Sequence, residues 1–257
     1  MTDLLTEPGD STPRRPSAFP ATQWSVVLQA GSESPARAQA ALASLCQLYW
    51  YPLYAFVRRL GHSHHEAEDG TQGFLAHLLK TAGLQRADPE RGRFRTFLLT
   101  SLRHYLSNEL RRDKAAKRGG GVAPLSYQAE SAEAHYLQQE GAGALAPEVA
   151  FDRDWALGVI ERTLRELRDE YGRSRREAVF NALAPLVWGH ETRERVAEAA
   201  AQLQMTPPAL TVALHRLRRR VGERLRANVA ETVADPAEVD AELRYLIQVV
   251  SEPADRR

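Results

Sequence analysis

Apolar residues recur every three or four positions through most of the chain, and no alternating β-branched run is long enough to predict a strand. Capping residues, prolines and glycines divide this pattern into segments. Ser34 and Pro35 open one helix, Pro52 is expected to kink or break it, and Gly61 ends it. The pattern predicts an all-α protein, whose further helices cover about residues 22–31, 63–80, 94–112, 151–171, 175–188, 192–203, 208–230 and 235–250.

The helix expected over 94–112 has two unlike faces. Its large apolar side chains, among them Phe94, Leu98 and Leu102, share one face. The residues on the opposite face are Arg103, His104, Ser107, Asn108, Arg111 and Arg112. Such side chains bind phosphates and base edges, and residues 91–118 carry nine Lys/Arg against two acidic residues. The pattern favours nucleic-acid binding, and the alternative is the solvated face of an ordinary packed helix.

Residues 191–226 predict a helix-turn-helix. A short helix precedes a tight turn, in which Gln204 is expected in the left-handed conformation, and a basic helix follows. We expect Pro207 to lie outside the second helix and Pro208 to be its first residue. The side chains that would face a DNA groove are Pro208, Ala209, Thr211, Val212, His215, Arg216 and Arg219. Few of them are polar, so we expect limited base readout with the two arginines on phosphates, and a plain helical hairpin is the alternative.

Charge is unevenly distributed along the chain, although its net value is only +1. Residues 21–118 carry 14 Lys/Arg against 8 Asp/Glu, and residues 151–230 carry 15 against 11. Between them, residues 119–150 carry four glutamates and no basic residue, and their Gly, Ala and Pro content predicts a flexible acidic connector with room for one transient helix. We therefore expect two helical modules that both meet a polyanion, flanked by a disordered tail over 1–20 and an acidic helix and tail over 231–257.

The composition argues against several classes of protein. A single cysteine, Cys46, suits a reducing compartment, the longest apolar run is too short to span a membrane, and the first residues do not resemble a secretory signal. We expect a cytoplasmic protein. The sequence shows no phosphate loop, nucleophile elbow or acid–base pair, so we do not expect an enzyme, and we expect no cofactor. Residues 62–69 contain three histidines and three acidic residues, but Ser63 and Glu66 have the spacing of a capping box, so we expect a helix start there and no metal.

Four stretches together resemble the extracytoplasmic-function group of bacterial RNA polymerase sigma factors. They are YPLYAFVRRLG, AEDGTQGF, RGRFRTFLLTSLRHYLSNELRRD and LTVALHRLRRR, and their order and spacing extend the resemblance from about residue 22 to the C-terminus. The resemblance implies a region 2 helical bundle over 21–118 and a region 4 helix-turn-helix over 151–230. The ending ETVADPAEVDAELRYL also resembles the extended C-terminus of one subgroup.

The resemblance also implies partners and roles. The helix at 63–79 would dock on the clamp helices of the largest subunit of core RNA polymerase. The residues expected in this contact are Glu68, Asp69, Gln72 and Phe74. The loop at 81–93 and the helix at 94–112 would melt the −10 element of promoter DNA, which adds Arg93 and Arg95 to the expected DNA-binding residues. The helix-turn-helix would read the −35 element and meet the polymerase flap, and an anti-sigma factor or another regulator is a further partner that the resemblance allows.

Two glycines depart from the family pattern. Gly70 and Gly73 stand in the docking helix where a bulky apolar and an acidic residue are usual, and an interior glycine costs a helix about 1 kcal/mol. Weak docking would leave a polymerase-independent DNA-binding regulator derived from a sigma factor, which is the alternative function. A metal-dependent hydrolase at 62–69 is a third hypothesis.

The C-terminal helix is expected to be acidic and amphipathic. Its apolar residues Val239, Leu243, Leu246, Ile247 and Val250 are expected to share one face. This helix either packs on the second domain as structure, or it covers a DNA-binding face with its carboxylates until polymerase or a signal displaces it.

Overall fold

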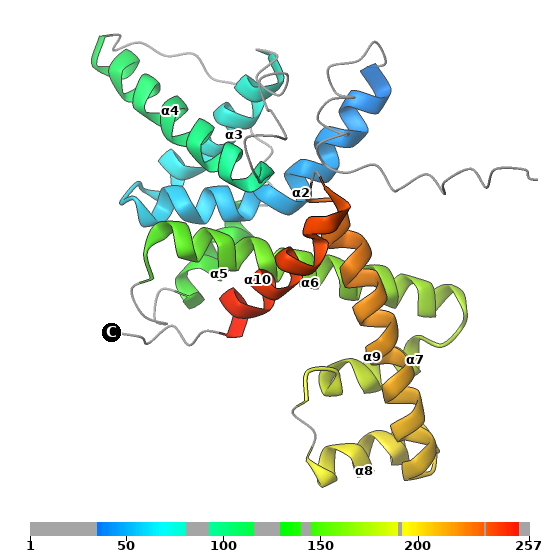
Figure 1. Cartoon of the computed structure of the whole chain (residues 1–257). Coiled ribbons are helices and arrows are strands. Elements are labelled where there is room, and N and C mark those ends of the chain that lie inside the picture. Colours follow the sequence, from blue (N-terminus) through cyan, green and yellow to red (C-terminus); the bar gives the residue numbers. More distant parts are fainter. Residues whose placement is uncertain are drawn as a thin grey trace, which may run out of the picture.

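A computed structural model describes residues 35–80, 93–115, 129–139, 145–189, 192–233 and 235–251. Every regular element within these ranges is a helix, which confirms the all-α fold (Figure 1). The elements are α2 (Pro35–Arg59), α3 (His64–Lys80), α4 (Phe94–Ala115), α5 (Ala129–Gln139), α6 (Pro147–Arg173), α7 (Glu177–Leu183), η3 (Ala184–Leu186), α8 (Arg193–Gln202), α9 (Pro207–Ala230), η4 (Pro236–Glu238) and α10 (Val239–Ser251). The helix expected at 22–31, the tail over 1–20 and almost all of the loop at 81–93 lie outside the described residues. None of the described helices combines the length and the apolar character that crossing a membrane requires.

Helices α2, α3 and α4 form the upper part of the molecule in Figure 1, with α2 as their central member. Pro52 does not break α2, which continues through it to Arg59 and buries Leu53, Tyr54 and Phe56 completely. The start of α3 has the expected capping box, because Ser63 N donates to Glu66 Oε2 at 2.8 Å and Glu66 N donates to Ser63 Oγ at 3.3 Å.

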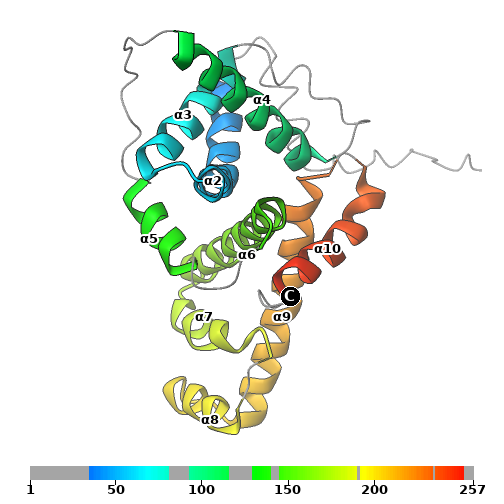
Figure 2. The same cartoon turned by 90° about the vertical axis from the view of Figure 1, so that its left-hand side faces the viewer.

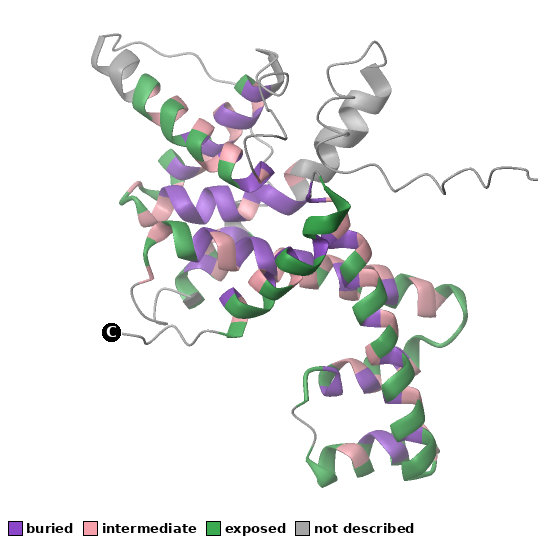
Figure 3. Cartoon of the chain, in the orientation of Figure 1, coloured by how far each residue is buried: buried purple, intermediate pink, exposed green. Residues whose placement is uncertain are grey.

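The first hydrophobic core does not follow the domain boundaries expected at residues 118, 150 and 230. It continues from α2, α3 and α4 into α6, the last turns of α9 and α10, where it includes Trp155, Val229 and Leu246. Figure 3 shows buried residues along each of these helices. Helix α6 lies along α2, and α10 lies against α6 and α9 (Figures 1 and 2). The segments on both sides of the expected connector therefore share one core.

The expected connector itself contains the helix α5. Its Ala132 and Tyr136 are buried against α2. Glu133 accepts hydrogen bonds from Arg58 Nη2 at 2.8 Å and Arg58 Nε at 3.0 Å. Residues 129–139 are thus a packed helix and not the flexible chain that their composition indicated, because a few apolar side chains and one paired glutamate are enough to hold them on α2.

A second core joins the end of α6 to α7, η3, α8 and α9. Leu167, Phe180, Leu183, Leu210 and Leu217 are its most deeply buried members. Because α6 and α9 contribute to both cores, these two long helices connect the upper and lower parts of the molecule seen in Figure 1.

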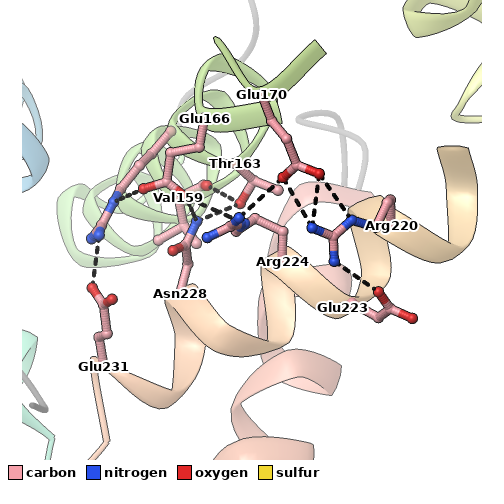
Figure 4. Close-up of polar contacts among 10 residues, drawn as sticks. Val159, Thr163, Glu166, Glu170, Arg220, Glu223, Arg224, Asn228 and Glu231 are labelled. Atoms are coloured by element: carbon pink, nitrogen blue, oxygen red, sulfur yellow. Dashed lines mark hydrogen bonds and ion pairs between the residues drawn. The ribbon is translucent and has the colours of Figure 1, made fainter. Parts of the chain in front are cut away.

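Polar contacts reinforce the packing of α6 on α9 (Figure 4). Asn228, which is buried, donates from Nδ2 to Thr163 Oγ1 at 3.0 Å and to Glu166 Oε2 at 3.1 Å. Further along α9, Arg220 Nη2 and Arg224 Nη2 donate to Glu170 Oε2 at 3.0 and 3.2 Å. The ladder of contacts makes the orientation of α9 on α6 specific as well as stable.

The turn between α8 and α9 has the expected geometry at one residue and differs at another. Gln204 has φ of +52°, as expected. Helix α9 begins at Pro207 and not at Pro208, because the side chain of Thr206 caps it by accepting from Ala209 N at 3.4 Å. Pro207 then takes the first helical position, where its missing N–H needs no partner.

Candidate nucleic-acid and protein-binding surfaces

The outer side of α3 carries three of the four residues expected to contact a polymerase. Asp69 is exposed, and Glu68 and Gln72 are half-buried. Gln72 Nε2 donates to Glu68 Oε1 at 3.0 Å, which fixes the two side chains side by side. Together they form a small acidic surface that remains open to a partner.

The fourth residue, Phe74, is a member of the core. Only 1% of it is exposed, and its ring packs against Tyr105 of α4 at a centroid distance of 5.9 Å. The expectation that Phe74 contacts a partner directly was wrong for this conformation. Phe74 lies on the inner face of α3, so its contribution to the docking surface is to hold α3 on α4.

The two unusual glycines of α3 lie where α4 crosses it. A Cβ on Gly73 would overlap the hydroxyl of Tyr105, and a Cβ on Gly70 would lie 3.2 Å from Leu106 Cδ2. The glycines therefore allow a close approach of the two helices, a packing reason for their presence that the sequence pattern did not indicate.

The histidine-rich start of α3 places His64, His65 and Glu68 together. One potential ligand atom from each lies within 4.8 Å of the others. Such groups can bind zinc. However, His64 Nδ1 is 2.7 Å from the hydroxyl of Tyr54, which itself donates to Glu133, so His64 has a structural role in joining α3 to α2 and α5. Burial and the hydrogen bond to Glu133 raise the pKa of Tyr54, so this hydroxyl remains a donor.

Arg95, expected to bind DNA, is buried at the start of α4. Only 4% of its side chain is exposed. Its guanidinium lies over the rings of Trp155 at 4.5 Å and Tyr245 at 4.8 Å, and its Nε is 3.0 Å from Asp152 Oδ1. Burial lowers the pKa of Arg95, and the charge of Asp152 opposes this shift. Direct DNA contact by Arg95 is thus excluded in this conformation.

Arg93 and Arg95 share one carboxylate, that of Glu242 from α10. Arg93 Nε is 3.0 Å from Glu242 Oε2, and Arg95 Nη1 contacts Glu242 Oε1. The Glu242 side chain is 1% exposed, whereas that of Arg93 is 39% exposed. The acidic C-terminal helix therefore reaches the residues that the sequence indicated as the beginning of a DNA-binding surface.

The exposed face of α4 carries the remaining expected residues. His104, Ser107 and Asn108 are exposed to solvent. Arg103 is also exposed, but it forms an ion pair with Glu148 at the start of α6 and its guanidinium lies 5.3 Å from the centre of the Phe56 ring. Arg111 and Arg112 belong to α4, and their side chains are outside those described.

The first turns of α9 present a separate basic surface. All of its expected members are exposed, namely Pro208, Ala209, Thr211, Val212, His215, Arg216 and Arg219. Arg216 makes no ion pair within the described part of the chain, and Arg219 pairs with Glu223 at 3.2 Å while 76% of its side chain stays exposed. Thr211 Oγ1 donates to the carbonyl of Pro207 at 3.0 Å, which leaves mainly apolar groups at the front of the helix.

Arg176, the residue before α7, extends this surface in a way that the sequence did not indicate. A cavity of about 610 Å³ between α7 and α9 is lined by Arg176, Met205, Val212 and Arg216, among others. Arg176 stacks on Tyr171 at 5.5 Å. Arg176 follows a turn at Arg175, whose φ is +55°. The spacing of residues in the sequence does not indicate that this turn lies beside α9.

Comparison with known proteins gave one match, which covers part of the chain. Residues 48–116 match the family model of Sigma-70 region 2, and this range includes α3, α4 and the second half of α2. Neither the curated proteins nor the solved structures gave a match. The chain therefore contains a Sigma-70 region 2 domain, and this domain supports a sigma factor of the sigma-70 family with a role in transcription initiation.

Proposed function

We propose that this protein is a sigma factor of the extracytoplasmic-function type. The observation that carries the proposal is the Sigma-70 region 2 match over α2, α3 and α4, with a second, open basic surface on α9 of the same chain. In this role it binds core RNA polymerase in the cytoplasm and directs it to promoters, and it catalyses no reaction itself.

The region 2 domain supplies the polymerase contact and the −10 contact. Helix α3 docks on the clamp helices through Glu68, Asp69 and Gln72, whose polar side chains face outward. Helix α4 receives the opened −10 element on its exposed face, where His104 and Asn108 offer hydrogen-bonding groups to an unpaired strand.

The unit formed by α8, the turn and α9 acts as the helix-turn-helix of region 4. The exposed front of α9 enters the major groove of the −35 element. Pro208, Ala209 and Val212 make apolar contacts there, and Arg216 and Arg219 bind phosphates. Base readout by this helix is consequently limited, and shape and charge contribute most of the affinity. The polymerase flap and an anti-sigma factor are further partners in this proposal.

A reconstituted transcription assay tests the proposal. Purified protein is mixed with core polymerase and a fragmented genomic library, and start sites are mapped by sequencing. Specific initiation that requires both the protein and the core supports the proposal. DNA binding without co-elution with core polymerase would instead support the polymerase-independent regulator, for which the internal pairing of Arg93, Arg95 and Arg103 is the favouring observation.

A further inference from the structure

Three arginines expected on the region 2 surface pair with carboxylates from outside residues 48–116. Arg93 and Arg95 pair with Glu242 of α10, and Arg103 pairs with Glu148 of α6. Both carboxylates belong to segments beyond residues 48–116. We propose that α10 is an intramolecular mask, and that it must leave the start of α4 before single-stranded promoter DNA can bind there; this proposal rests on the proposed function.

The geometry of α10 is that of an anion inserted between cations. Glu242 is 1% exposed, and it is the carboxylate that Arg93 and Arg95 share. Tyr245, one turn further along α10, donates its hydroxyl to Asp152. Both guanidiniums lie over the Tyr245 ring, at 5.0 and 4.8 Å. One face of α10 thus provides a negative charge and an aromatic ring, the two groups that a guanidinium meets when it binds a stacked nucleotide.

The charge balance at this site explains why a phosphate can take the place of the Glu242 carboxylate. The two arginines face two carboxylates, Glu242 and Asp152, so the closed site is neutral. When α10 leaves, Asp152 stays with α6, and Arg93 and Arg95 have an excess of one positive charge. A phosphate can replace the Glu242 carboxylate because both groups are anions that pair with a guanidinium. Buried ion pairs add little net stability compared with apolar packing, so a switching role accounts for their presence better than stability alone.

Helix α10 is held by contacts with α6 and α9. Its 13 residues are too few for a stable isolated helix, so its structure depends on its contacts. Val239, Leu246 and Val249 are buried, and Leu243, Tyr245 and Val250 pack against the same core, whereas Ile247, expected on the same face, is 57% exposed. The other charged contact of α10, between Asp240 and Arg226, is exposed and is screened by salt. Apolar packing therefore holds the mask in place, and DNA phosphates compete with Glu242 for Arg93 and Arg95.

Binding of a short labelled single-stranded DNA of mixed sequence to the full-length protein tests the mask. Glu242→Gln is expected to raise the affinity about tenfold and to make its salt dependence steeper, because two arginines become available to phosphates. Glu238→Gln is the matched control, since it removes the same charge from an exposed residue adjacent to α10. Its affinity is expected to equal that of the unchanged protein.

Leu246→Ala provides a second variant, because it weakens the apolar attachment of α10 without altering any charge. It is also expected to raise the affinity, and hydrogen exchange over 239–251 is expected to accelerate when DNA is added. Adding Arg93→Ala to Glu242→Gln should remove most of the gain. Unchanged affinity in both Glu242→Gln and Leu246→Ala, or an equal gain in Glu238→Gln, would overturn the mask.

These results are distinguishable from a failure of the proposed function. If neither the unchanged protein nor any variant initiates transcription with core polymerase, the sigma factor proposal fails. A gain in DNA affinity on releasing α10 would still support the mask in that case.

Discussion

Arg220 Nη2 donates to both carboxylate oxygens of Glu170, at 2.8 and 3.0 Å, and so ties the middle of α9 to the end of α6 (Figure 4). This contact lies beside the second hydrophobic core, to which the neighbouring Leu167 and Val221 belong. The side chains are 41% and 31% exposed, respectively, so the contact is solvated and its strength depends on pH and salt.

Glu170→Gln is expected to lower the free energy of unfolding by about 1 kcal/mol at neutral pH. The hydrogen bond from Arg220 holds the pKa of Glu170 below its ordinary value of 4.5. The stabilisation by a carboxylate of lowered pKa is complete above its unfolded pKa and is lost as pH falls through its folded pKa. The free energies of unfolding of Glu170→Gln and of the unchanged protein should therefore become equal in acid. Urea unfolding at neutral and acidic pH measures them, and Glu198→Gln, at an exposed residue of α8, should change little at either pH.

Gly73→Ala is expected to destabilise the protein by about 1–3 kcal/mol, although alanine is the better helix former. The new methyl group would overlap the hydroxyl of Tyr105, whose ring is held by Phe74 and His77. Adding Tyr105→Phe should recover part of the loss because it removes the overlapping atom.

Gly222→Ala is the matched control for this helix-crossing argument. Gly222 lies within α9, and a Cβ there would meet nothing within 4 Å. This variant should be stabilised by about 0.5–1 kcal/mol. Thermal unfolding of both glycine variants measures the contrast, and equal effects of one sign would refute the close-packing role of Gly73.

Substitutions at Asp69 and Phe74 should distinguish a residue that binds the polymerase from one that stabilises the fold. Asp69→Asn removes an exposed charge and is expected to weaken co-elution with core polymerase without changing stability. Phe74→Ala empties a buried position and is expected to lower the free energy of unfolding by about 3–5 kcal/mol. Circular dichroism melting and a polymerase pull-down distinguish the two outcomes. Loss of stability in Asp69→Asn would show that the acidic surface is structural.

Arg216→Ala is expected to weaken binding to duplex promoter DNA and to reduce the log–log salt slope by about one, the contribution of one phosphate contact. The loss should be similar for different −35 sequences, since a phosphate contact carries no base information. Arg173→Ala, at an exposed arginine at the end of α6, serves as the control. A loss that depends strongly on the −35 sequence would indicate base readout by Arg216 instead.

Local features of the fold could be predicted from the sequence because their causes are local. The capping box at Ser63 and Glu66 and the left-handed Gln204 follow from spacing and turn chemistry, and the structure confirms both. The exposed face of α9 follows from the spacing of its apolar residues every three or four positions. Helical spacing alone could not distinguish Phe74 in the core from Phe74 at a binding surface.

The pairings between distant segments could not be predicted in this way. Arg95 looks like a DNA contact until Trp155 and Glu242, from two other helices, are placed around it. Likewise, Gly73 looks like a weakness in α3 until Tyr105 lies across it. In both cases the role of the residue depends on which helix packs against it. The periodicity of the sequence does not predict which helices pack together.

Helix α9 is unbroken from the Thr206 cap to Ala230, and its 24 residues span about 36 Å. Its outer turns form the basic surface, and its inner turns bury Leu225 and Val229 beside α10. A continuous helix of this length can transmit a tilt from one end to the other. If a bound DNA groove tilts the outer end of α9, we expect the tilt to reach the inner end, where α10 is attached.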